Sequence, residues 1–290
     1  MMEFQYISRT EVDESQWNHL VENHPISSPY FHTAYLDAVC DWEAIVSKDY
    51  QLIFPLPYRR KKGVNYIYTP DFVQQLGVLS VGTFNMDDVL SLIPKKYKLI
   101  ELAFNETNVG WKGELRRNVV LDLSPSYEEL HSKFSSNHKR NLKKVFKELV
   151  FRTADLRSVW ELFKSNKGQS LNKFNEVTFE HLSRIFHSKM DVEVMGAYEG
   201  DELLTGMVLV RFQKRHIFLF SGNSDRGKEL KGMYGLINRE IEQLAGSEGI
   251  FDFEGSNDDN LARFYKGFGG REVFYPFYKM YRFPFNWIKK

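Results

Sequence analysis

The 290-residue chain has one cysteine, Cys40, almost no net charge and no long apolar segment. A single cysteine excludes an internal disulfide and fits a reducing compartment. No run approaches the ~20 apolar residues of a membrane-spanning helix, and the N-terminus has no signal-peptide segment. Since 39 basic residues face 38 acidic ones, any nucleic-acid contact must come from a local patch. We therefore expect a cytoplasmic protein without a transmembrane segment.

Motifs for metals and common cofactors are also missing. The eight histidines are scattered, and none has the spacing of a structural zinc site or a metalloprotease. No Gly-x-Ser-x-Gly elbow and no Walker-type phosphate loop occurs. The sequence therefore predicts no metal and no permanently bound cofactor.

Apolar residues are plentiful, at 42% of the chain with 15% aromatic, which is enough for packed cores. The length favours two domains. Both halves begin with helices, continue with strands of antiparallel character and end with a helix and a strand. We predict an α/β (α+β) protein of two related domains, 1–123 and 124–290, each a mixed, mostly antiparallel sheet flanked by helices.

The segment 251–270, FDFEGSNDDNLARFYKGFGG, carries the strongest chemical pattern. It predicts a strand over 250–254 and a helix over 258–267. In a strand, Asp252 and Glu254 share one face, where a desolvated carboxylate could accept a proton from an amine. The alternative is a structural ion pair with Arg263 or Lys266. Tyr265 is a candidate general acid or an ordinary core aromatic.

A basic segment lies in the sequence LSPSYEEL followed by SKFSSNHKRNLKKVFKE, which predicts one helix from about 124 to 147. At about 100° per residue its cations form a stripe opposite its apolar residues. The stripe could bind nucleic-acid phosphates or be a solvated face. His138 is expected to add to it. The candidate contacts are Lys133, Lys139, Arg140, Lys143, Lys144 and Lys147.

The element order from 214 to 267 resembles the GNAT acyltransferase fold, in which two parallel strands splay around the acyl donor. Phe264-Tyr265 with Gly269 is similar to the tyrosine that these enzymes place near the end of a helix, although Gly270 stands where phenylalanine is usual. Together with segment 132–148, SSPYFHTAYLDAV (27–39) and YTPDFVQQLGVL (68–79), segment 251–270 resembles the Fem-type branch, the peptidoglycan-bridge aminoacyltransferases or methicillin-resistance factors.

This resemblance implies amide-bond formation between an aminoacyl-tRNA ester and an amine on a cell-wall precursor, without a metal or a covalent intermediate. Several bridge enzymes carry a long helical hairpin that 155–190 has no room for. The loop SDRGKELKGMYG would face donor phosphates, where unpaired N–H groups at a helix start favour anions. Its candidate donor-binding residues are Arg226, Lys228, Lys231, Gly232 and Gly235.

Buried amides need hydrogen-bond partners, so Gln74 and Gln75 are candidates for acceptor binding together with Tyr66 and Tyr68. They could equally form a buried network between the halves. The aromatic and basic C-terminal run could touch a membrane surface or be a closing strand.

Three functions remain open. The first is an aminoacyl-tRNA-dependent transferase, the second a transferase that uses acetyl-CoA or another acyl-CoA on a small amine or sugar, and the third a non-catalytic binding protein.

Overall fold

The computed structural model describes residues 3–108, 113–167, 176–255 and 257–286, and they fold as two compact units. Unit 1 comprises 1–116 and 274–290, and unit 2 comprises 117–273. The sequence predicts a single boundary near 123. In the structure the C-terminal segment belongs to the unit that contains the N-terminal segment. No helix within the described residues combines the length and the apolar character that crossing a membrane requires.

Unit 1 is built on a mixed sheet with strand order β1-β2-β3-β4-β6-β13. The first strands are antiparallel neighbours, β4 and β6 are parallel, and β13 closes antiparallel to β6. Its elements are β1 (Phe4–Ser8), η1 (Arg9–Glu11), α1 (Glu14–Asn23), η2 (Pro29–Phe31), α2 (Thr33–Val39), β2 (Asp41–Ser47), β3 (Leu52–Lys61), β4 (Val64–Tyr68), β5 (Leu79–Ser80), α3 (Met86–Ser91), β6 (Tyr97–Ala103) and η3 (Glu106–Asn108).

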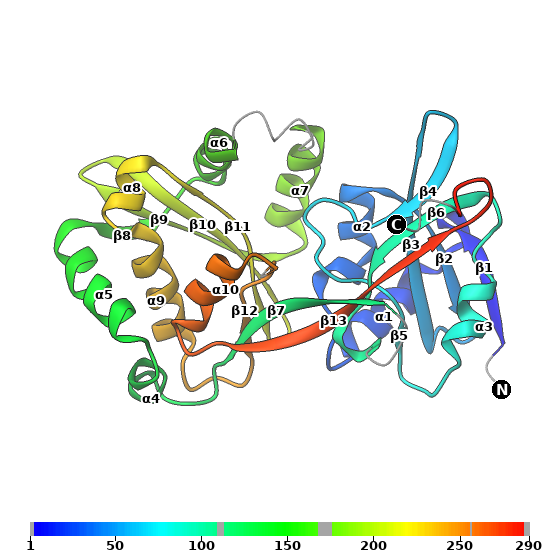
Figure 1. Ribbon diagram of the computed structural model, residues 1–290, viewed down its shortest axis with the longest axis horizontal. Coiled ribbons are helices and arrows are strands. Elements are labelled where there is room, and N and C mark those ends of the chain that lie inside the picture. The colour runs from blue at the N-terminus through cyan, green and yellow to red at the C-terminus, as the bar shows by residue number, and fades with distance from the viewer. Residues whose placement is uncertain (1–2, 109–112, 168–175, 256, 287–290) are drawn as a thin grey trace. The chain divides into compact units, whose positions relative to one another are not determined.

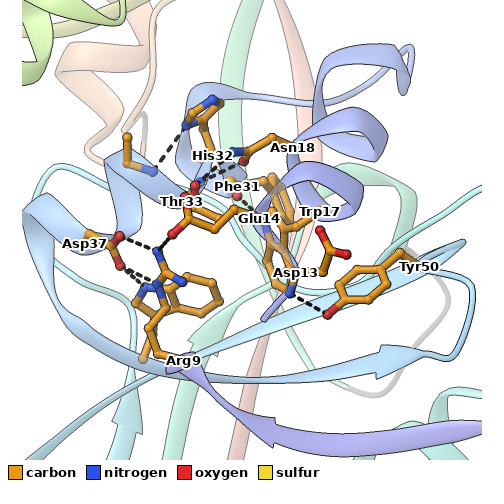
Figure 2. A network of polar contacts seen from close by, with 12 residues as sticks. Arg9, Asp13, Glu14, Trp17, Asn18, Phe31, His32, Thr33, Asp37 and Tyr50 are labelled. Atoms are coloured by element: carbon orange, nitrogen blue, oxygen red, sulfur yellow. Dashed lines mark hydrogen bonds and ion pairs between the residues drawn. The ribbon is translucent and has the colours of Figure 1, made fainter. Parts of the chain in front are cut away.

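Polar contacts tie η1, α1 and α2 of unit 1 together (Figure 2). The Arg9 guanidinium donates to both carboxylate oxygens of Asp37 at 2.7 Å and also to Glu14. Asn18 on α1 donates to the Thr33 hydroxyl at 2.9 Å and accepts from the Thr33 N–H at 3.1 Å. The start of α2 is thereby tied to α1 in one register.

Unit 2 repeats the plan of unit 1, with strand order β8-β9-β10-β11-β12-β7. Strands β8 to β11 are antiparallel neighbours, β11 and β12 are parallel, and β7 closes antiparallel to β12. Its elements, with the shared strand β13, are β7 (Glu114–Asp122), α4 (Tyr127–Ser132), α5 (Ser136–Glu148), β8 (Val150–Thr153), α6 (Leu156–Lys167), α7 (Glu176–Ser188), β9 (Asp191–Glu199), β10 (Glu202–Phe212), β11 (Arg215–Asn223), α8 (Asp225–Glu229), α9 (Gly232–Leu244), β12 (Ile250–Asp252), α10 (Asp259–Lys266) and β13 (Arg271–Tyr281).

The closing strands are exchanged between the two units. β7 follows β6 in the chain but closes the sheet of unit 2, and β13 follows β12 but closes the sheet of unit 1. The predicted duplication of one α/β plan is therefore present, with the last strand of each copy traded.

Helices cover both faces of the unit 2 sheet, with α5 and α9 on one side and α6 on the other (Figure 1). Successive residues of β10 show this alternation. Gly206 faces Val159 of α6, whereas Thr205 faces Gly232 of α9. The apolar core on the α9 side joins α5, α9, β12 and α10 in one cluster of buried side chains.

One carboxyl on α9 lies inside this packing. Glu240 is 1% exposed, and within the described part of the chain neither of its oxygens has a hydrogen-bond partner. The nearby Arg211 is paired with Glu193. Burial therefore dominates and raises the pKa of Glu240 from 4.5 to about 7, with Arg211 opposing the shift. The structure accordingly contains a core acid that ionises near neutrality.

We expect Glu240→Gln to change how stability depends on pH. Because the pKa is raised in the folded state, ionisation disfavours folding, and wild-type stability falls as pH rises from 4.5 to about 7. At pH 8 the variant should be more stable than the wild type by about 3 kcal/mol, an order-of-magnitude figure, and the difference should vanish near pH 4.5. Urea unfolding across pH measures this. The exposed Glu242→Gln on the same helix is the matched control, and parallel curves for Glu240→Gln and wild type would refute the assignment.

Candidate active site

Strands β11 and β12 run together briefly and then part. Their parallel pairing covers Arg215 to Ile217 and ends where Ile217 meets Asp252, while β11 continues to Asn223. The register between β10 and β11 shifts here, since Val208 pairs with Phe220 and Leu209 with Phe218, so Leu219 is an extra residue. Such a bulge bends its strand. β11 runs on beyond the last residue that pairs with β12, and the acidic segment begins where this pairing ends.

Asp252 is the most fully engaged acid of this region. It is 2% exposed, pairs with the Arg215 guanidinium at 2.5 Å and accepts from the Asn118 side chain at 2.8 Å. A third bond at 3.0 Å comes from the backbone N–H of Glu254. The structural ion pair considered from the sequence is present, but its partner is Arg215 of β11 and not Arg263 or Lys266. Asp252 thus holds three neighbouring segments together.

Glu254 lies beyond the strand. The strand predicted over 250–254 ends at Asp252, and Glu254 has a left-handed backbone with φ of 53°. The expectation that Asp252 and Glu254 share one strand face is therefore wrong, because the chain turns between them. The Glu254 side chain is half-buried, and burial raises the pKa of its carboxyl well above its ordinary value.

Tyr265 on α10 lies next to this carboxyl. Its ring stacks on Phe253 with centroids 4.6 Å apart. Burial raises the pKa of the phenol, and the Glu254 charge raises it further. The fold thus brings together two of the predicted catalytic residues, a carboxyl that holds a proton more readily than an exposed glutamate and a phenol that keeps its proton.

The loop after β11 is only partly as predicted. Arg226 is paired with Glu199 at 2.7 Å, and Lys228 with Asp225 at 2.7 Å, so both cations are already neutralised. Lys231 is exposed, has φ of 65° and provides no side-chain cap for α9. The first turn of α9 therefore has no side-chain cap from Lys231.

Gly232 and Gly235 have a packing reason that the sequence did not reveal. A Cβ on Gly232 would lie 2.3 Å from the Thr205 hydroxyl, and one on Gly235 would lie 2.1 Å from the Phe151 ring. Both glycines therefore let α9 approach the sheet, and their open sides face protein. Their predicted role as points of close approach for a donor is not supported by these contacts.

The basic segment is two helices and not the single helix predicted. Ser126 caps α4 with a capping box, and Ser135 begins α5 by accepting from the His138 N–H. Lys133 ends α4 and is exposed, and Lys139 is half-buried with its ammonium donating to the Ser132 carbonyl at 2.7 Å. The exposed cations of α5 are Arg140, Lys143, Lys144 and Lys147.

These α5 cations, which we call the α5 basic face, form no ion pair with any described residue. His138 does not belong to this face, contrary to expectation. It is 4% exposed, donates from Nε2 to the Phe264 carbonyl at 2.9 Å, and its Nδ1 lies 2.8 Å from the Ser135 hydroxyl. Burial lowers its pKa. The imidazole is therefore a neutral link between α5 and α10.

The predicted acceptor residues lie in unit 1. Tyr66 and Tyr68 share a face of β4, with ring centroids 5.8 Å apart, and the Arg59 guanidinium lies over both rings at 4.9 and 4.3 Å. Gln75 is 8% exposed and donates to the Gln74 side chain at 2.9 Å. Burial raises the pKa of Tyr68 to about 12. Arg59 was not predicted from the sequence. Its place on the hairpin strand opposite the two tyrosines could have been inferred from the alternation of side chains along the two strands.

The described residues contain no cluster of three metal-ligating side chains. A pocket of about 400 Å³ lies beside α1, lined by Gln16, His19 and Tyr50 among others, and no predicted site residue lines it.

No family model and no curated protein matches the chain, whereas many solved structures match its fold. FemX aligns with a TM-score of 0.67 and 12% identity, over 96% of this chain and 98% of its own. The C-terminal domain of a putative lysylphosphatidylglycerol synthetase from Agrobacterium fabrum aligns with a TM-score of 0.56 and 11% identity, over 92% and 90%. A tandem GNAT protein from the clavulanic acid biosynthesis pathway gives 0.51 and 11%, over 97% and 98%.

The chain thus has a tandem GNAT-type α/β fold. It shares that fold, at low sequence identity, with FemX and with the lysylphosphatidylglycerol synthetase domain. The fold predicted from the sequence, and the resemblance to the Fem-type branch at the level of fold, are confirmed.

Removing the Asp252 carboxylate should destabilise unit 2 strongly. Asp252→Ala removes the carboxylate that pairs with the buried Arg215 guanidinium, and breaking a buried ion pair typically costs about 3–5 kcal/mol. Asp252→Asn keeps the shape and an acceptor oxygen and should cost less. The matched control is Asp259→Ala, whose side chain is 85% exposed in its pair with Arg117 and which should cost under about 1 kcal/mol. Chemical denaturation measures all three, and equal losses for Asp252→Ala and Asp259→Ala would contradict this account.

Proposed function

We propose that the protein is an acyltransferase that forms an amide bond on an amine acceptor. The observation that carries the proposal is the Glu254–Tyr265 pair, beside the divergence of β11 and β12, in a fold shared with FemX and a tandem GNAT protein. In that arrangement the acceptor amine attacks the donor carbonyl, and the Glu254 carboxylate takes the proton that the amine loses. Tyr265 donates a hydrogen bond or its proton to the leaving group.

Asp252 acts in this proposal as a positioning residue. Its carboxylate pairs with Arg215 and accepts hydrogen bonds from Asn118 and the Glu254 N–H, so we assign it no role as a base. Its bond to the Glu254 backbone fixes the turn that directs the carboxyl of Glu254. These contacts support a positioning role for Asp252 in place of the catalytic role that its sequence position suggests.

We propose aminoacyl-tRNA as the donor and an amine of a cell-wall peptide precursor as the acceptor, which would make this a peptidoglycan-bridge type of enzyme. The α5 basic face supports the RNA part, since four exposed cations without acid partners among the described residues suit phosphates. In unit 1, Tyr66, Tyr68, Gln74 and Gln75 remain the proposed acceptor contacts, with Arg59 added.

A second donor is favoured by a separate observation. The start of α9 has no side-chain cap from Lys231, and N–H groups at a helix start attract phosphate. The pyrophosphate of an acyl-CoA would suit this position, and the acceptor would then be a small amine or sugar. The fold shared with the tandem GNAT protein, whose structure was determined without AcCoA, also supports an acyl-CoA donor.

The two donors predict different thermal-shift responses. With bulk tRNA, the melting temperature should rise at low salt and the rise should shrink at moderate salt, because phosphate contacts release counterions. Lys143→Gln with Lys144→Gln should abolish that response. If aminoacyl-tRNA is the donor, coenzyme A and acetyl-CoA should leave the melting temperature unchanged. If acetyl-CoA alone raises the melting temperature, the donor is an acyl-CoA and not aminoacyl-tRNA. If no ligand changes the melting temperature, a non-catalytic binding protein is favoured.

Glu254→Gln should reduce transfer by about 100-fold or more, the usual range for loss of a general base, and it should not lower the melting temperature, because it removes a carboxyl whose ionised form burial disfavours. Tyr265→Phe keeps the ring that stacks on Phe253 and should reduce transfer at least tenfold. Because burial raises the pKa of Glu254, wild-type transfer should rise with pH on a limb lying above 4.5, and this limb should be missing in Glu254→Gln. The exposed Glu202→Gln serves as control. A large stability loss with normal activity per folded molecule would remove Glu254 from the chemistry.

A further inference from the structure

Three strands of unit 1 bring separate segments to one end of its sheet. The parallel register aligns Asn65 of β4 with Tyr97 of β6, and the antiparallel register aligns Leu99 of β6 with Tyr281 of β13. The start of β4, the start of β6 and the end of β13 therefore meet at this end. The β3–β4 turn, the loop before β6 and the segment after β13 are neighbours there.

The β3–β4 turn carries a run of cations. Arg60, Lys61 and Lys62 are exposed, and Lys62 and Gly63 have φ of 48° and 80°, as a two-residue turn with both central residues left-handed requires. These three side chains form no ion pair with any described residue. Of the acids near the base of the hairpin, Glu43 is taken by Lys96 and Asp41 lies opposite Tyr58. The tip of the hairpin is therefore positively charged.

The segment after β13 is fixed at the same end of the sheet, with β6 between β13 and β4. The Arg282 side chain donates to the carbonyls of Pro94 at 2.6 Å and Ile93 at 3.0 Å, and the Arg282 N–H donates to the Lys98 carbonyl at 2.8 Å. This clamp presents Phe283 with 79% of its surface exposed, next to the loop that carries the exposed Lys95. We call Arg60, Lys61, Lys62, Lys95 and Phe283 the basic rim.

We propose that the basic rim docks unit 1 on a phospholipid surface rich in anionic headgroups. Cations attract such headgroups at about one Debye length or less, and an exposed aromatic ring beside them can enter the apolar boundary beneath. A nucleic acid would also pair with the cations. The exposed Phe283 ring favours the bilayer, because a bilayer has an apolar layer directly beneath its phosphates and a nucleic acid does not. The attachment is peripheral, and it does not depend on the transfer chemistry proposed for unit 2.

Vesicle flotation of the full chain tests the proposal. Binding to phosphatidylcholine vesicles should be weak, and inclusion of about 30% phosphatidylglycerol should strengthen it in a salt-sensitive way. Arg60→Gln with Lys61→Gln should weaken binding to the anionic vesicles about 25-fold, at roughly fivefold per charge. Phe283→Ser should weaken it severalfold at unchanged charge. None of these changes touches the fixed geometry of Lys62 and Gly63.

The matched control is Lys143→Gln with Lys144→Gln, which removes the same charge from the α5 basic face. It should bind anionic vesicles like the wild type while losing the tRNA response. Equal loss in both double variants would mean that overall charge alone drives attachment and would overturn the proposal. Loss of the tRNA response in the rim variant, with vesicle binding intact, would assign the rim to nucleic acid instead. If Phe283→Ser binds anionic vesicles as tightly as the wild type, the aromatic ring does not contribute to docking.

Discussion

The Asp252 carboxylate is the contact on which unit 2 depends most. Its two oxygens bind a guanidinium of β11, an amide of β7 and the backbone that follows β12. At 2% exposure this anion is held by its partners in place of water, so one buried charge ties together three segments whose register the β11–β12 and β12–β7 pairing sets. The position of Glu254 beside Tyr265 follows from that register, since the turn that carries Glu254 begins on the same carboxylate.

Much of the architecture was predictable, because helices and strands follow from the local pattern of apolar, polar and capping residues. Apolar periodicity and capping serines give the helices, and the order of elements indicates two copies of one α/β plan. The break between α4 and α5 was missed although Ser135 is a helix-capping residue, because the cationic stripe continues across it. The exchange of β7 and β13 could not be predicted, since a strand's partner depends on which sheet edge is open and not on its own sequence.

The site was predictable in its residue types and less so in its roles. The sequence places Asp252 and Glu254 in one candidate site, but a period of two does not apply where the chain turns at a left-handed residue. Gly232 and Gly235 were read as facing a ligand, and the structure shows that they face Thr205 and Phe151. His138 and Glu240 illustrate the same limit. Whether a polar residue on an amphipathic helix meets water or core depends on the packing of other elements.

The exchanged closing strands also constrain how the protein can be made. Residues up to 116 leave the ribosome first, yet the sheet of unit 1 lacks its last strand until β13, beginning at 271, has been synthesised. At typical elongation rates that interval is on the order of ten seconds. During it, the open edge of β6 offers unpaired backbone groups to any other strand. Nascent chains on one messenger are therefore exposed to mispairing with each other, and a chaperone that covers this edge would protect them.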